Sequence, residues 1–249
     1  MDYHIKKHEW ERIVRILSAI QGIRTKNELK LRRFIEAIWF IARTCCQWRL
    51  LPLTYGAWRS VHQRFMRWNR KNIWTILFEE SRDPDLQEIM IDGTSIRAHA
   101  CAGGYEKNTH EIHALGRSKG GFTTKIHAAV DALGNPLRFI ITAGQRNEIT
   151  QADDLTQGFQ HSCLIADKAY DKEAFIKDLE SHGNTVVIPP RKNRKIQRYY
   201  DPYVYKERHL IECFFGKLKQ FRRIFSRFDK CADTFLSFIH FVSTLIWLR

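Results

Sequence analysis

Two acidic side chains in this sequence stand where they could hold metal ions. Asp92 follows the apolar run Ile89-Met90-Ile91, and Asp167 follows Leu164-Ile165-Ala166 in the same way. Carboxylates are hard oxygen ligands for divalent ions, and a pair of such ions flanking a phosphodiester supports its cleavage and transfer. A single acid after a strand is more often a helix cap or a turn residue, so each aspartate also keeps that structural interpretation.

A third acid lies in a segment with helical spacing. Its polar residues are 3, 4 and 7 positions apart: Tyr205, Arg208, Glu212 and Lys219. At 3.6 residues per turn they fall within roughly 60° of one another, on one face of a helix. The opposite face is apolar: Leu210, Phe214, Leu218, Phe221 and Phe225. Glu212 would then be a third carboxylate, with Arg208 and Lys219 placed to meet a phosphate. Without the two aspartates, the same spacing describes an ordinary amphipathic helix.

The charge balance points to a polyanionic partner. The 249 residues contain 41 Lys and Arg against 27 Asp and Glu, a formal net charge of +14. Such an excess favours nucleic acid as the partner, although a basic surface can also serve solubility alone. The hydrophobic content of 44% is ordinary for a packed protein, so a largely disordered chain is not the default expectation.

Helices are expected up to about Glu80, where apolar residues recur at helical spacing. One expected helix carries an aromatic stripe: Trp58, Val61, Phe65 and Trp68. Arginines lie between the residues of this stripe, and Arg59, Arg64 and Arg67 are the candidates for contacts with DNA. The alternative is a solvated basic face on a packing helix.

Beyond Leu86 the pattern changes to strands that alternate with helices. Residues 122–130 and 137–142 are expected to form a hairpin around Gly134-Asn135-Pro136, and further strands are expected at 163–166 and 185–188. This order predicts an α/β fold with a mixed sheet flanked by helices. The boundary is placed near Pro84, which gives a helical DNA-binding module at 1–84 and a catalytic domain at 85–249.

A basic run follows the last expected strand and precedes two tyrosines. Its cationic candidates for contacts with the DNA backbone or with a distorted DNA end are Arg191, Lys192, Arg194 and Lys195. A solvated loop explains the same residues equally well.

The remaining features favour a protein of the cytoplasm. The six cysteines show no CxxC spacing and are expected to be buried, reduced thiols. The first residues lack the apolar core of a signal peptide. The apolar stretch from Phe235 to Leu248 is shorter than the roughly 20 residues that span a bilayer, so we expect a buried closing helix and no membrane partner.

The spacing of Tyr205, Arg208, Glu212 and Lys219 matches the Y-(2)-R-(3)-E-(6)-K signature of DDE transposases of bacterial insertion sequences. Other segments resemble insertion sequence family five. They are residues 48–52 with the aromatic stripe, Leu115–Gly121, Thr124–His127, Asp131–Gly134 and Asp167–Asp171. The resemblance covers almost the whole chain.

This resemblance implies an RNase H-like fold, with the first acid on the first strand, the second after the fourth strand and the glutamate on a later helix. It implies that Asp92, Asp167 and Glu212 hold two Mg²⁺ ions, with Mn²⁺ as a substitute. Tyr205, Arg208 and Lys219 would then lie near the DNA. Asp171 competes with Asp167, but the family's D-x-x-Y-D pattern favours Asp167. Glu148 departs from the family pattern, in which an aspartate is expected.

The function implied is DNA transposition. Such a protein binds the terminal inverted repeats of its element and target DNA, cleaves strands and transfers them, as a homodimer or higher oligomer in the bacterial cytoplasm at the nucleoid. Two alternatives stay open. One is an RNase H-like nuclease that cleaves without strand transfer, and the other is a DNA-binding regulator that has lost catalysis.

Overall fold

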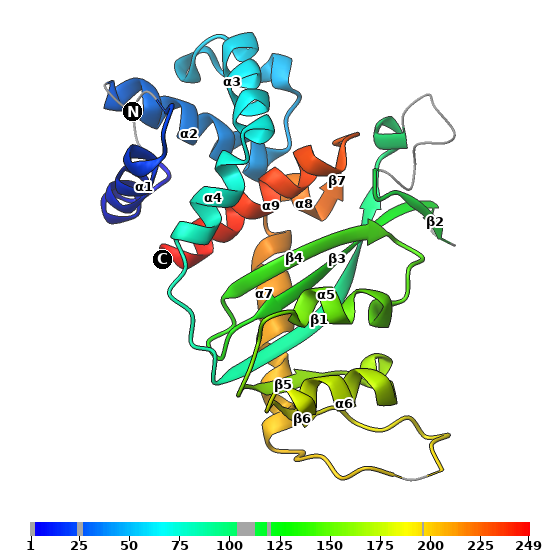
Figure 1. Ribbon diagram of the computed structural model, residues 1–249. Helices are drawn as coiled ribbons and strands as arrows, with labels where there is room; N and C mark the ends of the chain where they lie inside the picture. Colours follow the sequence, from blue (N-terminus) through cyan, green and yellow to red (C-terminus); the bar gives the residue numbers. More distant parts are fainter. Residues whose placement is uncertain (1–2, 24–26, 104–112, 119–120, 196) are drawn as a thin grey trace. The chain divides into compact units, whose positions relative to one another are not determined.

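The computed structural model describes residues 3–23, 27–103, 113–118, 121–195 and 197–249. They fall into two compact units (Figure 1). Unit 1 comprises Met1–Arg82, His99–Gly104 and Leu218–Arg249, and unit 2 comprises Asp83–Ala98 and Tyr105–Lys217. Along the chain, unit 2 is therefore inserted between two long segments of unit 1.

Unit 1 is mainly helical, as its apolar spacing predicts. Its principal helices are α1 (Lys7–Ala19), α2 (Glu28–Thr44), α3 (Trp58–Arg70), α4 (Ile73–Glu80), α8 (Arg222–Phe225) and α9 (Ala232–Trp247). Shorter elements are the 3-10 turns η1 (Trp48–Leu50), η2 (Leu53–Tyr55) and η3 (Ala100–Gly103), and strand β7 (Ser226–Arg227). Asn27 caps α2, because its side chain accepts a hydrogen bond from the backbone of Lys30 at 2.9 Å. Asn72, with a left-handed φ of 54°, separates α3 from α4.

The core of unit 1 is built from aromatic rings that meet across α3, α4 and α9. Phe65 of α3 stacks on Phe238 of α9 at 4.7 Å between ring centroids. Trp74 of α4 meets Phe241 of α9 edge to face at 5.5 Å. All four rings are buried, so α9 is the buried closing helix that the sequence predicts.

Unit 2 contains the sheet and its helices. The strands are β1 (Glu88–Ala98), β2 (Gly116–Ser118), β3 (Gly121–Val130), β4 (Pro136–Ala143), β5 (Cys163–Ala166) and β6 (Thr185–Val187). The helices and 3-10 turns are η4 (Glu148–Gln151), α5 (Ala152–Thr156), η5 (Lys168–Tyr170), α6 (Glu173–Ser181), η6 (Val204–Arg208) and α7 (His209–Lys219). The predicted hairpin is confirmed as β3 and β4, and the strand predicted at 163–166 is β5.

The sheet of unit 2 has the RNase H-like order β4-β3-β1-β5-β6, with the short β2 also paired to β3. β1 pairs antiparallel with β3, and β3 pairs antiparallel with β4. β1 pairs parallel with β5, and β5 pairs parallel with β6. The mixed sheet and the position of the first acid on its first strand therefore follow the predicted fold.

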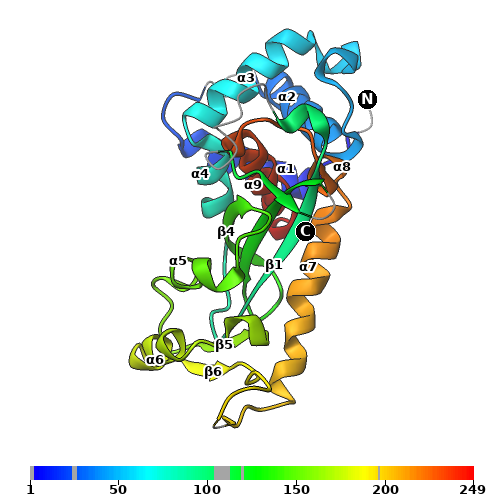
Figure 2. The ribbon, with the colours of Figure 1, turned by 90° about the vertical axis from the view of Figure 1, so that its right-hand side faces the viewer.

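Helices cover the two faces of this sheet. Figures 1 and 2 both show α7 on one face and α5 and α6 on the other. Asp92 is paired with Ala128, and Ala128 with Phe139, so the three side chains share one face. Phe139 stacks on Phe214 of α7 at 5.8 Å, which identifies this face as the one under α7. Gly93, Lys125 and His127 belong to the opposite face.

Several sequence expectations need correction. The segment predicted as one helix from Tyr205 begins as the 3-10 turn η6, and α7 ends at Lys219. Because the helical period stops there, Phe225 does not continue the buried stripe and is 62% exposed. The cysteines carry free thiols, but Cys101, Cys213 and Cys231 are exposed, so uniform burial was wrong.

The compact units also depart from the linear division at residue 84. The first change of unit falls after Arg82, close to the expected boundary, but Leu218–Arg249 belongs to unit 1 with the N-terminal helices. Apolar residues of α9 that pack against α3 and α4 account for this assignment. No helix in the described part of the chain is both long and apolar enough to cross a membrane.

Candidate active site

The two aspartates occupy matching positions on neighbouring parallel strands. Ile91 of β1 is in register with Ala166 of β5, the last residue of that strand. Asp92 and Asp167 each follow the last paired residue, so the register brings them to the same point of the sheet. Residues 75 positions apart in sequence (167 − 92) thus become neighbours.

Local hydrogen bonds orient both aspartates. One oxygen of Asp92 accepts from the backbone of Gly93 at 2.7 Å. One oxygen of Asp167 accepts from the backbone of Ala169 at 2.7 Å, which caps η5. Asp167 therefore acts as a cap through this oxygen, as its structural interpretation predicts. This cap is compatible with a second role of Asp167 at the site.

Arg208 links the first aspartate to the glutamate of α7. Its guanidinium donates to Asp92 at 2.8 Å and to Glu212 through a second nitrogen. Tyr205 lies on the same turn as Arg208. Burial raises the pKa of the Tyr205 hydroxyl, the charge of Arg208 lowers it, and the charge of Asp167 raises it again. Tyr205, Arg208 and Glu212 are thus gathered around Asp92 and Asp167, which lie next to each other.

The fourth signature residue, Lys219, ends α7 and falls in unit 1. Its side chain is half-buried, and burial lowers the pKa of its ammonium group. Its role at the site stays a prediction.

The surroundings of Asp92 shift its pKa upward. Burial raises the pKa of Asp92 to about 6, a hydrogen bond from Gly93 and the charge of Arg208 act against this, and the charges of Asp167 and Glu148 add to it. A carboxylate in such surroundings gains from a nearby cation, because the cation offsets both the desolvation and the repulsion. Arg208 supplies part of that positive charge.

The donor set suits a hard divalent cation. Asp92, Asp167 and Glu212 present only oxygen, the ligand type that Mg²⁺ and Mn²⁺ prefer. Among the described residues, no three acidic, histidine or cysteine side chains are close enough to hold an ion between them. The guanidinium of Arg208, which is itself a cation, lies between Asp92 and Glu212 instead.

Two other acids of unit 2 act on groups other than Asp92. Asp171 accepts hydrogen bonds from Arg194 at 2.7 Å and from Arg198 at 3.3 Å. Glu207 acts on Glu88 at the start of β1, where burial and then the charge of Glu207 raise the pKa of Glu88. Neither acid is among the charges that act on Asp92.

The sequence did not predict a cluster of polar side chains on the face of the sheet opposite α7. Lys125 of β3 pairs with Glu148 at 3.2 Å, and both side chains are largely buried. Tyr170 is fully buried beside them, and its hydroxyl has no hydrogen-bond partner in the described part of the chain. No periodic pattern marks Glu148, which follows β4. Gly93, directly after Asp92, could have indicated that another group approaches the strand closely there.

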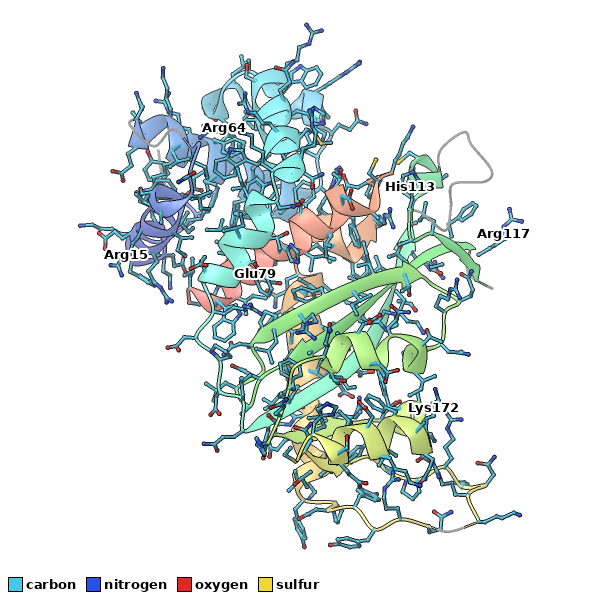
Figure 3. All side chains as sticks on the ribbon, in the orientation of Figure 1. Arg15, Arg64, Glu79, His113, Arg117 and Lys172 are labelled. Carbon is cyan, nitrogen blue, oxygen red and sulfur yellow. The ribbon has the colours of Figure 1, made fainter. Side chains whose placement is uncertain are left out.

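The arginines of α3 occupy different surroundings. Arg59 and Arg67 are exposed, whereas Arg64, labelled in Figure 3, lies over the ring of Phe34 at 4.4 Å. A hollow of about 710 Å³ in unit 1 is lined by four cations among its eight residues: Lys30, Arg64, Arg67 and Lys71. The structure thus gathers Arg64 and Arg67 with further positive charge, and it places Arg59 outside this group.

The basic run after β6 is held by contacts within unit 2. Arg191 donates to the backbone carbonyls of Lys168 and Ala169 at 3.0 and 2.8 Å. Arg194 pairs with Asp171 at 2.7 Å and with Glu173 at 2.8 Å. The two lysines of this run, Lys192 and Lys195, are exposed.

Two protein families match this chain. Residues 83–238, more than half of the chain, match the family described as "Transposase DDE domain". Residues 5–78 match the family described as "Putative transposase of IS4/5 family". The two matches meet near the expected boundary at Pro84.

Curated relatives match about half of the chain. A Brucella ovis protein, "Putative transposase for insertion sequence element IS6501", is 43% identical over 132 residues, which are 51% of this chain and 99% of the relative. A Sinorhizobium fredii protein, "Uncharacterized protein y4sN", is 34% identical over 105 residues, which are 40% of this chain and 81% of the relative.

Two solved structures are distantly similar. One is a piggyBac transposase synaptic complex with hairpin DNA, with a TM-score of 0.41, 14% identity and coverage of 77% of this chain and 50% of that one. This chain therefore spans about half the length of the piggyBac chain. The other is a pre-cleavage Mos1 transpososome, with a TM-score of 0.28, 12% identity and coverage of 98% and 93%. Likenesses this distant add nothing to the matches above.

Proposed function

Because the chain belongs to the DDE transposase family of insertion sequences, we propose that it binds the ends of its element and cuts and joins DNA there with Asp92, Asp167 and Glu212. The observation that carries this proposal is the register of β1 and β5, which places Asp92 beside Asp167, together with the pairing of Arg208 to Asp92 and Glu212. The predicted family and fold class are confirmed; the site residues stay proposals.

Asp92, Asp167 and Glu212 would hold two Mg²⁺ ions, with Mn²⁺ as a substitute. Bound divalent ions supply Lewis acidity, which activates a water or a DNA 3′-hydroxyl and stabilises the leaving oxygen. Tyr205 and Arg208 orient the scissile phosphate, since Arg208 already lies between two carboxylates and can donate to a phosphate oxygen. Attack is in line, first by water and then by the 3′-hydroxyl, without a covalent bond between protein and DNA.

The N-terminal helices, predicted as the DNA-binding module of residues 1–84, would recognise the element's terminal inverted repeats. Arg64 and Arg67 are placed for this by the hollow that they share with Lys30 and Lys71. Joining two ends to a target requires both ends in one assembly, so we propose a homodimer or higher oligomer on double-stranded DNA. The place of action would be the bacterial cytoplasm, at the nucleoid.

The test removes one carboxylate charge and keeps the shape of the side chain. Glu212→Gln should lower strand cleavage with Mg²⁺ on the order of 100-fold or more, because a ligand is lost from a site that works as a unit. Binding of the same DNA, measured in Ca²⁺ by fluorescence anisotropy, should be unchanged.

Glu207→Gln is the matched control, because it removes the same charge from η6 near Glu88 and should leave cleavage intact. Cleavage by Glu212→Gln at the wild-type rate, or full cleavage by the wild type in EDTA, would falsify the proposed site.

A further inference from the structure

A buried ion pair lies on the face of the sheet opposite α7. Lys125 of β3 and Glu148 of η4 are 3.2 Å apart, with side-chain exposures of 15% and 19%. Burying two charges is costly, and a buried pair by itself rarely adds stability. Such a pair therefore calls for an explanation beyond packing.

Glu148 reaches the strand residue that follows Asp92. A β-carbon added to Gly93 would lie 3.0 Å from the Glu148 Cγ atom and 3.1 Å from its Oε1 atom. The space that a side chain at position 93 would occupy is thus taken by the Glu148 carboxylate. Gly93 in turn donates its backbone N–H to Asp92 at 2.7 Å, so the two acids approach one peptide unit from its two sides.

A cavity connects Glu148 with the loop that carries Asp167. It has a volume of about 370 Å³ and is lined by Lys125, Asn147, Glu148, Ile149, Ala169 and Arg191. Ala169 belongs to η5 and donates its N–H to Asp167. The cavity therefore has room for several waters beside Glu148 and the loop that carries Asp167.

A buried hydroxyl supports the same assignment. Tyr170 is fully buried, and no described residue hydrogen-bonds its hydroxyl. Burial raises the pKa of this hydroxyl, and the charges of Glu148, Asp92 and Asp167 raise it further. The hydroxyl therefore lies near all three acids. A buried polar group without a partner is commonly satisfied by water or by a water bound to an ion.

From these contacts we propose that Glu148 is a fourth carboxylate of the metal site, directly or through water, and that Lys125 neutralises it when no ion is bound. The inference rests on the proposed function, because it adds a ligand to the site of Asp92 and Asp167. Lys125 then competes with the cation for Glu148. The two residues of the pair should consequently have opposite effects on metal affinity.

The experiment measures Mn²⁺ binding to the full chain without DNA, at pH 7, by isothermal titration calorimetry. Glu148→Gln should weaken Mn²⁺ binding by about 10-fold or more. Glu148→Asp should restore part of the affinity, because it returns the charge. Lys125→Met should tighten binding a few-fold. Circular dichroism confirms that each variant is folded.

Glu180→Gln is the matched control, since Glu180 is an exposed acid of α6 in the same unit and should bind Mn²⁺ like the wild type. Asp92→Asn serves as the reference for a lost ligand. Equal affinity in Glu148→Gln and the wild type, with Asp92→Asn impaired, would overturn this inference alone. Weakening in both Glu148→Gln and Lys125→Met would also overturn it, because it would assign the effect to a structural ion pair. A wild type that binds no Mn²⁺ would refute the proposed function itself.

Discussion

The sequence predicts DNA contacts for the arginines of α3 and for those that follow β6. The structure places the two groups in different surroundings. Arg67 is exposed and shares a hollow with three other cations, and the described residues that line this hollow include no carboxylate. Arg194 is paired with Asp171 and Glu173, and Arg191 is bound to two carbonyls. An arginine that is already neutralised within the protein releases few counterions when DNA binds. The difference shows that the count of basic residues predicts affinity for DNA only after the internal partners are known.

The largest effect is expected when the acid that pairs with the arginines after β6 is removed. Asp171→Ala leaves Arg194 and Arg198 without the side chain that accepts from both, and Asp171 has no exposed side-chain surface. We expect the free energy of unfolding to fall by about 3 kcal/mol, as for a broken buried ion pair.

Hydrogen exchange can assign this loss to unit 2. All seven tryptophans lie in unit 1, so tryptophan fluorescence follows that unit and serves as the internal reference. Amide exchange should rise in α6 and β6 while fluorescence unfolding changes less. Asp178→Ala removes an exposed acid of α6 and should cost under about 0.5 kcal/mol. Equal losses in the two variants would contradict a special role for Asp171.

A smaller effect is expected at α3. Arg67→Gln should weaken binding to the element ends by about 10-fold and reduce the slope of log affinity against log salt concentration by about 1. Its stability should be unchanged, because Arg67 is exposed. Arg194→Gln, as the counterpart, should lose stability and keep most of the salt slope. An unchanged slope in Arg67→Gln would remove this arginine from the DNA interface.

A few-fold effect is expected from the lysines beside the arginine network. Lys195 is exposed and lines a hollow with Glu173, Arg194 and Arg198. Lys195→Gln should weaken DNA binding about threefold through the loss of one phosphate contact, with no change in melting temperature. If binding is unaffected at low salt, the run after β6 stabilises unit 2 and does not contact DNA.

The smallest change in stability is expected when the pH is lowered. Burial would raise the pKa of Asp171, but hydrogen bonds from Arg194 and Arg191 and the charges of Arg194 and Arg198 outweigh it and lower that pKa. The stabilisation is therefore fully present above the unfolded value of about 3.9 and is lost as the pH falls through the lower folded value. The stability advantage of the wild type over Asp171→Ala should be constant from about pH 7 to 5 and shrink only below about pH 4. Urea unfolding at each pH measures it.

The sequence predicted those elements whose signal is local. β5 was predicted residue by residue, because an apolar run ends sharply at Asp167, and the hairpin of β3 and β4 follows from its Gly-Asn-Pro turn. The approach of Asp92 to Asp167 could be expected from the family signature, and the structure accounts for it by strand register.

What could not be predicted depends on contacts between distant residues. Arg194 pairs with an acid 23 positions earlier, and nothing in the basic run indicates that partner. Glu148 reaches Gly93 only because β1, β3 and β4 lie side by side, and the sequence marked it merely as a departure from a pattern. Phe225 was misassigned because helical periodicity does not show that α7 ends at Lys219.

The position of α9 in unit 1 also determines the order in which this chain can fold. Its His240 hydrogen-bonds Thr75 of α4 across 165 residues of sequence, so the core of unit 1 cannot close before the last helix has been synthesised. Until then the rings of Phe65 and Trp74 lack their partners on α9 and present apolar surface to other chains. Long-range contacts of this kind slow folding and favour aggregation of intermediates. Unit 2 ends at Lys217 and can assemble earlier, so a nascent chain would complete its carboxylates before its helical unit, and holdase chaperones should recognise α3 and α4 first.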